Sequence, residues 1–189
     1  MGKILRREFY QRLTLEVARE LLGKFLVREF ENGQRLVVKI VEVEAYCGPE
    51  DLACHSSHGR TERTAVMFGP AGQAYVYLIY GIYHCLNIVT EKPGAAVLIR
   101  ALEPTLDDSS RTAVDRSASG PGKLCQWLKI DKSFNGWDLT KGEKLWLENG
   151  PEEKFEIKTS PRIGVAYAGE WAKKPWRFYI KDNDSVSGP

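Results

Sequence analysis

One stretch of the sequence, residues 41–46, most restricts how this chain can fold. It reads Val-Glu-Val-Glu-Ala-Tyr and continues an apolar run at 36–40, so β-branched residues predict one long strand. On a period of two, one face of that strand would carry Leu36, Val38, Ile40, Glu42, Glu44 and Tyr46. A carboxylate on an apolar face costs several kcal/mol unless it is paired. We therefore expect Glu42 and Glu44 to have a charged partner or a chemical task.

The residues alone leave several explanations of Glu44 open. A buried ion pair with an arginine such as Arg100 is the ordinary explanation for a single glutamate in a strand. The two carboxylates, about 7 Å apart at the backbone by strand rise, would also suit the acid and base of a glycosidase or a pair of metal ligands.

A second stretch, residues 74–83, contains four tyrosines. If it were one strand, Tyr75, Tyr77 and Tyr83 would share a face and Tyr80 would lie on the other. Gly81 marks a position where a strand bends or turns. We predict that Tyr80 and Gly81 form the tip of a hairpin that holds an aromatic ring in water, and such a ring indicates a binding partner.

The remaining elements follow from local signals. Thr14 is a plausible N-cap of an amphipathic helix that stops at Gly23, and Asn32-Gly33 predicts a hairpin. The predicted segments are strands at 24–30, 34–46, 84–89 and 95–102, a polar loop at 47–66 with His55, His58, Arg60 and Arg63, a mobile loop at 105–119, a helix at 123–130 and short strands within 137–180.

Length and composition set limits on the class of protein. With 189 residues, 43% of them hydrophobic, the chain can form one core, and we expect a single domain over 1–189 with a tail at 183–189 that could be disordered. No membrane-length apolar run or signal peptide is present, which predicts a cytoplasmic protein. The four cysteines are scattered, as expected of reduced thiols.

Two apparent ligand-binding motifs do not match the patterns that they resemble. Cys47, Cys54, His55 and His58 lack the paired spacing of structural zinc sites, so we expect no metal. Residues 120–123, Gly-Pro-Gly-Lys, only partly resemble a phosphate-binding loop, because the lysine is followed by leucine.

Several motifs nevertheless occur together along almost the whole chain. In order, they are Glu44-Ala45-Tyr46, Gly48-Pro49-Glu50-Asp51, Cys54-His55-Ser56, Met67-Phe68, Tyr75-Val76-Tyr77-Leu78-Ile79-Tyr80-Gly81, Arg100-Ala101-Leu102-Glu103-Pro104, Gly120-Pro121-Gly122-Lys123 and Gly169-Glu170-Trp171-Ala172. In order, spacing and composition, this series resembles the alkyladenine (3-methyladenine) DNA glycosylase family. The expected fold is therefore α+β, with a mostly antiparallel curved sheet, flanking helices and a protruding β-hairpin.

The resemblance implies roles for individual residues. Glu44 would activate a water held between it and Arg100, and that water would attack the sugar carbon as a damaged purine leaves. Tyr80 would be the wedge that enters the DNA, because such enzymes must extrude the nucleotide from the stack. The purine would lie between Tyr77 on one side and Tyr46 with His55 on the other.

Further residues complete this expected site. Asn87 would exclude guanine through its extra amino group. Arg60, Arg63 and Lys123 would face DNA phosphates. No lysine nucleophile lies in the matched motifs, so we expect a monofunctional, monomeric enzyme without a cofactor that acts on damaged double-stranded DNA in the nucleoid.

Two other classes of protein use some of the same residues. A non-catalytic module that binds damaged DNA or RNA would need the pocket tyrosines but not Glu44. A glycosidase acting on free sugars or nucleosides would need neither the protruding Tyr80 nor the basic loop.

Overall fold

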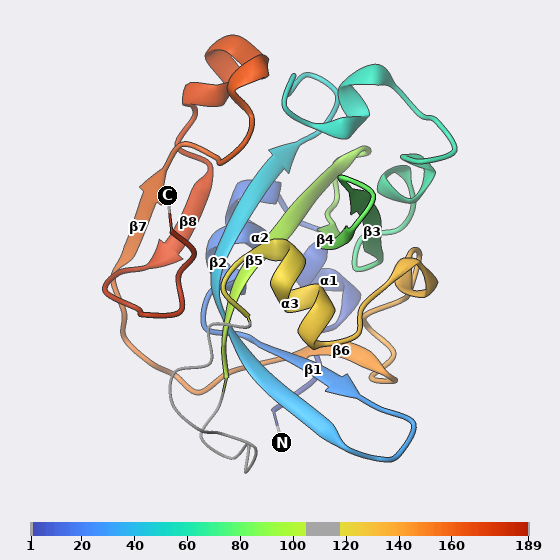
Figure 1. Cartoon of the computed structure of the whole chain (residues 1–189), viewed down its shortest axis with the longest axis vertical. Coiled ribbons are helices and arrows are strands. Elements are labelled where there is room, and N and C mark those ends of the chain that lie inside the picture. The colour runs from blue at the N-terminus through green and yellow to red at the C-terminus, as the bar shows by residue number, and fades with distance from the viewer. Residues whose placement is uncertain (1, 105–117, 189) are drawn as a thin grey trace.

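The computed structural model describes residues 2–104 and 118–188, and within them the strands form one eight-stranded sheet (Figure 1). The strand order is β3-β4-β5-β2-β1-β6, with β8 paired to β2 and β7 to β8, and every pairing is antiparallel. The strands are β1 Phe25–Glu29, β2 Arg35–Cys47, β3 Ala74–Ile79, β4 Tyr83–Val89, β5 Ala95–Pro104, β6 Leu145–Glu148, β7 Ile157–Ser160 and β8 Arg177–Ile180. The expected α+β class is confirmed.

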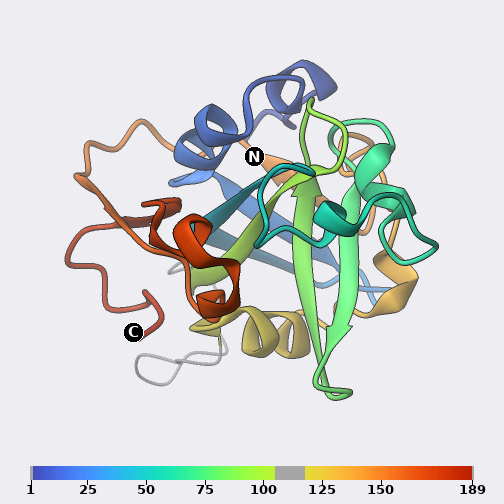
Figure 2. The ribbon, with the colours of Figure 1, turned by 90° about the horizontal axis from the view of Figure 1, so that it is seen from above.

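Short helices cover the sheet. The α-helices are α1 Arg7–Tyr10, α2 Thr14–Leu21 and α3 Pro121–Trp127, and the 3-10 helices are η1 His55–His58, η2 Ala65–Phe68, η4 Lys132–Phe134 and η5 Ala166–Lys173. Figure 2 shows α1 and α2 on one side of the sheet and α3 on the other. None of the described helices is long and apolar enough to cross a membrane.

Two helix boundaries differ from the sequence prediction. The N-cap of α2 is Leu13, and the Thr14 hydroxyl instead lies 2.9 Å from the Thr90 hydroxyl. The helix predicted at 123–130 begins two residues earlier, because Pro121 suits the first turn of a helix, where no amide hydrogen is required. The loop predicted at 105–119 lies mostly outside the described residues.

The long strand β2 does not keep one face throughout, so the predicted shared face of residues 36–46 is wrong. Its pairing with β5 shifts register between Ile40 and Glu42 and again between Glu42 and Val43. Ile40 and Val41 are consequently both in the main core, followed by Val43 and Ala45. Since side chains alternate along a strand, Glu42 and Glu44 lie opposite that core face. The register shift thereby places both carboxylates outside the main core.

The tyrosine-rich stretch forms the predicted hairpin of β3 and β4, and its tip extends beyond the body of the molecule (Figure 2). Tyr80 and Gly81 have φ of 53° and 70°, and the amide of Ile82 donates to the carbonyl of Ile79 at 3.1 Å. Two positive φ angles in a row match the twist of a hairpin. The Tyr80 side chain is 84% exposed, as the sequence predicted.

The end of the chain packs back on the sheet. The sequence left residues 183–189 as a tail that could be disordered, whereas in the described part Ser187 donates its amide to Glu42 at 2.7 Å and accepts a hydrogen bond from Arg177 at 3.0 Å. A buried carboxylate and a buried guanidinium therefore hold this segment, an interaction that its polar composition does not reveal.

Candidate active site

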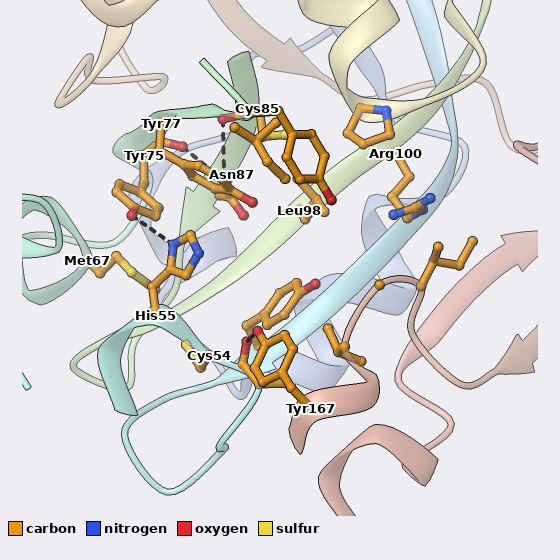
Figure 3. A pocket seen from close by; sticks show the side chains of 18 residues that line it. Cys54, His55, Met67, Tyr75, Tyr77, Cys85, Asn87, Leu98, Arg100 and Tyr167 are labelled. Atoms are coloured by element: carbon orange, nitrogen blue, oxygen red, sulfur yellow. Dashed lines mark hydrogen bonds between the residues drawn. The ribbon is translucent and has the colours of Figure 1, made fainter. Parts of the chain in front are cut away.

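A cavity of about 340 Å³ opens beside the tyrosine hairpin (Figure 3). Its walls come from β2 to β5, from η1, η2, α3 and η5, and from the loops before η1 and η5. The lining residues are Tyr46, Ala53, Cys54, His55, Met67, Tyr75, Tyr77, Ile79, Tyr80, Cys85, Asn87, Leu98, Arg100, Pro121, Ile163, Gly164, Val165 and Tyr167. The cavity thus contains six residues that the sequence singled out, Tyr46, His55, Tyr77, Tyr80, Asn87 and Arg100.

Glu44 is fully buried directly behind this lining. One carboxylate oxygen accepts a hydrogen bond from the amide of Ile163 at 2.7 Å and lies 3.3 Å from Nη1 of Arg100. The other accepts from the hydroxyl of Tyr46 at 2.9 Å. These three partners line the cavity, although Glu44 itself does not. The ion pair expected as the structural alternative is therefore present, and it lies against a cavity.

The electrostatics of Glu44 are a balance between burial and polar contacts. Burial raises the pKa of Glu44, while Arg100, the amide of Ile163 and the hydroxyl of Tyr46 act in the opposite direction. Burial and the adjacent Glu44 together raise the pKa of Tyr46, so its hydroxyl stays protonated and can donate. A carboxylate with a raised pKa is better suited to accept a proton near neutral pH.

The aromatic wall differs from the predicted sandwich. The rings of His55 and Tyr77 have centroids 4.5 Å apart, a separation at which rings are in direct contact. Figure 3 shows these two residues and Tyr75 gathered on one side of the cavity, with Arg100 on the other. A flat base has no room between His55 and Tyr77, so the prediction that they lie on opposite faces of a purine is wrong.

His55 is held as a neutral ring. Its Nδ1 lies 3.0 Å from the hydroxyl of Tyr75, and burial, followed by the charges of Arg63 and His58, lowers its pKa to about 4. At neutral pH the imidazole therefore carries no charge. A neutral ring can stack on a positively charged base without repelling it.

Asn87 lies at the same wall, 4% exposed. Its side-chain amide nitrogen donates to the carbonyl of Tyr75 at 3.1 Å. This bond to the backbone of β3 fixes the orientation of the side chain at the cavity wall.

The basic residues are exposed, and their relation to the cavity varies. The guanidinium of Arg63 lies 5.3 Å from the centre of the Tyr77 ring, and that ring lines the cavity. Lys123 follows Gly122, where a Cβ would lie 2.9 Å from the Tyr83 side chain, so Lys123 flanks the hairpin. Arg60 is exposed in the loop after η1 and does not line the cavity.

Sequence reasoning missed the loop that precedes η5. Besides Ile163, it contains Arg162, whose buried guanidinium donates from Nη2 to Oδ1 of the buried Asp51 at 2.8 Å. The guanidinium of Arg162 lies 4.7 Å from the centre of the Tyr46 ring and so supports that ring. The available sequence signal was a glycine, Gly164, two residues after Arg162; in the structure its φ is 76°. Tyr167, at 72% exposed, lies at the cavity rim and donates to the carbonyl of Ala53.

No group of three or more His, Cys, Asp or Glu side chains in the described part of the chain could hold a metal ion. The cavity offers aromatic faces and one arginine instead, and the buried carboxylate of Glu44 contacts that arginine from behind the lining. This set of groups suits a flat, polar organic ligand.

Comparisons with known proteins agree on one family. The sequence pattern of the family described as Methylpurine-DNA glycosylase (MPG) matches residues 8–184. A candidate 3-methyladenine DNA glycosylase from Methanocella arvoryzae is 53% identical over 193 residues, which cover 97% of this chain and 96% of that protein. One from Legionella pneumophila (strain Paris) is 53% identical, with 99% of both chains covered. The DNA-3-methyladenine glycosylase of Homo sapiens is 48% identical over 95% of this chain and 66% of the human protein.

Proposed function

Because this chain belongs to the methylpurine-DNA glycosylase family, we propose that it hydrolyses the N-glycosidic bond of damaged purines in DNA and so starts base excision repair. The observation that carries the proposal is Glu44, a buried carboxylate held by Arg100, Tyr46 and Ile163 against an aromatic cavity. A module that only binds nucleic acid would use the aromatic rings but would gain nothing from this carboxylate.

Glu44 acts as the base in the proposed reaction. A carboxylate has about four sites for accepting hydrogen bonds, and Glu44 accepts two, from Tyr46 and Ile163, with Nη1 of Arg100 a further 3.3 Å contact, so it can still accept a hydrogen bond from a water. Glu44 takes a proton from that water, whose oxygen forms a bond to the anomeric carbon as the bond to the base breaks. The bonding electrons leave with the purine. Because the transition state resembles an oxocarbenium ion, the carboxylate also stabilises it electrostatically.

The purine reaches the cavity by extrusion from the DNA stack. In our proposal, Tyr80 enters the gap, and the extruded base lies between Tyr46 on one face and His55 with Tyr77 on the other. Stacking on each face contributes roughly 1 to 3 kcal/mol. Asn87, fixed to the carbonyl of Tyr75, blocks the amino group that distinguishes guanine. A purine such as 3-methyladenine already carries positive charge, so it leaves readily beside neutral rings.

Release of bases from methylated DNA tests the proposed function. The protein is incubated with methylated duplex DNA, and free bases and intact strands are quantified, with unmethylated DNA as the control. We expect release of methylated purines and abasic sites without strand cleavage. Lesion binding without release would instead support a non-catalytic binding module.

The reaction should depend on pH through Glu44. Only the ionised carboxylate accepts a proton, and burial raises its pKa, so the rate should fall as pH decreases through this raised value and level off above it. His55, with a pKa of about 4, stays neutral from about pH 5 to about pH 8 and should add no inflection in that range. Single-turnover release of a cationic alkylated purine measures both effects. A rate that rises on acidification would contradict the assignment.

Binding should weaken steeply with salt, since we place Arg60, Arg63 and Lys123 against DNA phosphates. Each phosphate contact that is removed should flatten the log-log salt slope by about one unit. The test compares the wild type with the Arg60→Ala, Lys123→Ala double variant by titration at several salt concentrations. Lys158→Ala, an exposed lysine of β7 paired with Glu156, is the matched control. An unchanged slope in the double variant would exclude both residues from the interface.

A further inference from the structure

Glu42 is a second fully buried carboxylate, which the proposed reaction does not use. It accepts hydrogen bonds from Nε of Arg100 at 3.1 Å and from Nε of Arg177 at 2.6 Å. The amide and the hydroxyl of Ser187 also donate to it, at 2.7 Å and 2.9 Å. Four donors from three separate parts of the chain therefore converge on one side chain.

Ser187 connects the two arginines of this cluster. Its backbone carbonyl accepts from Nη2 of Arg177 at 3.0 Å, and its hydroxyl oxygen lies 3.4 Å from Nη2 of Arg100. Because the same hydroxyl donates to Glu42, Ser187 links Glu42 to Arg100 in addition to their direct contact. The end of the chain is thereby joined to the wall of the cavity.

The cluster determines which way the guanidinium of Arg100 points. Its Nε is held by Glu42 and its Nη2 by Ser187, while its Nη1 lies 3.3 Å from Glu44. A guanidinium is planar and presents its donors in a rigid fork. Holding two of its nitrogens therefore fixes the direction of the third.

The charges lead to the same conclusion. Glu42 and Glu44 are both fully buried, and Arg100 contacts both of them. If Arg100 alone paired with both carboxylates, one positive charge would face two negative charges. A buried charge without an opposite charge beside it destabilises the folded protein. Arg177 supplies a second positive charge to Glu42, which leaves Arg100 available to Glu44.

We propose that Glu42, Arg177 and Ser187 are positioning residues that hold Arg100 against Glu44, so that the C-terminal segment of the chain takes part in base release. This inference rests on the proposed glycosylase function. None of the three residues lines the cavity, so in this proposal they act through Arg100.

The test is Ser187→Ala, which removes the hydroxyl and leaves the backbone contacts in place. We expect single-turnover base release at saturating enzyme to slow about tenfold, the effect of losing a hydrogen bond to a charged group. The dissociation constant for lesion DNA should stay within about twofold, because Ser187 does not line the cavity that would hold the lesion. Ser187→Thr, which retains a hydroxyl, should restore most of the rate.

Ser185→Ala is the matched control. Ser185 lies two residues earlier in the same segment, and its hydroxyl makes no hydrogen bond to the described residues, so its loss should leave the rate unchanged. If the wild type releases base and Ser187→Ala releases it at the same rate, the positioning role is overturned and the proposed function stands. A Ser187→Ala variant that is impaired only in DNA binding would overturn the positioning role in the same way. Absence of base release by the wild type would overturn the proposed function itself.

Discussion

Replacing Glu44 by glutamine is expected to slow base release by at least about 10²-fold, the loss typical of removing a positioned general base. An amide of the same shape still accepts a hydrogen bond from Ile163 or Tyr46, but it cannot take a proton from water. Arg100 keeps its contact with Glu42, so the cavity wall should remain in place. Lesion binding should therefore be retained while release is lost.

Two measurements separate these effects, namely single-turnover release and equilibrium binding of the same lesion duplex. Glu156→Gln is the control, since Glu156 forms an exposed ion pair with Lys181 and does not line the cavity. A Glu44→Gln variant that releases base at the wild-type rate would mean that Glu44 is only the structural partner of Arg100.

Shortening Tyr80 to alanine should leave the melting temperature almost unchanged and should greatly slow release from paired DNA. The ring is 84% exposed at the hairpin tip, so it contributes little packing to the free protein. On DNA, its absence allows the gap to refill, and the equilibrium shifts back toward the stacked base. The loss should be smaller for a mispaired lesion or a lesion in single-stranded DNA, where less unstacking is required.

A thermal melt and single-turnover release from paired and unpaired substrates test this expectation. Tyr10→Ala provides the contrast, because Tyr10 is fully buried and its truncation should destabilise the fold by about 3 to 5 kcal/mol. Tyr80 is not a wedge if Tyr80→Ala lowers the melting temperature as strongly as Tyr10→Ala does. The same conclusion follows if Tyr80→Ala slows release by the same factor from paired and unpaired substrates.

Local features of the fold were readable from short windows of sequence. The hairpins at Asn32-Gly33 and Tyr80-Gly81 form where predicted, because a glycine, which tolerates positive φ, occurs between the strand-forming runs in both, at Gly33 and Gly81. The helix α2 and the strand β5 likewise lie within a residue or two of their expected bounds. Propensity and periodicity act between near neighbours, so they need no knowledge of the rest of the chain.

The arrangement of the site depends on contacts between distant residues. The register shift near Val41 switches the face that Glu42 and Glu44 occupy, although the alternation of residues suggested a continuous face. The contact between His55 and Tyr77 likewise puts together two rings that were expected on opposite faces of a purine. This shift belongs to the pairing between β2 and β5, so the alternation of residues in β2 alone did not reveal it.

Residue types therefore pointed to the chemistry, and packing established its geometry. Glutamate, tyrosine, histidine and arginine in these motifs were enough to suggest a base pocket with a carboxylate. The amide of Ile163 lies 119 residues along the chain from Glu44, and Ser187 lies 145 residues from Glu42, so neither contact could be inferred from spacing. These contacts form because buried carboxylates require hydrogen-bond donors, and the folded sheet determines which distant donors reach them.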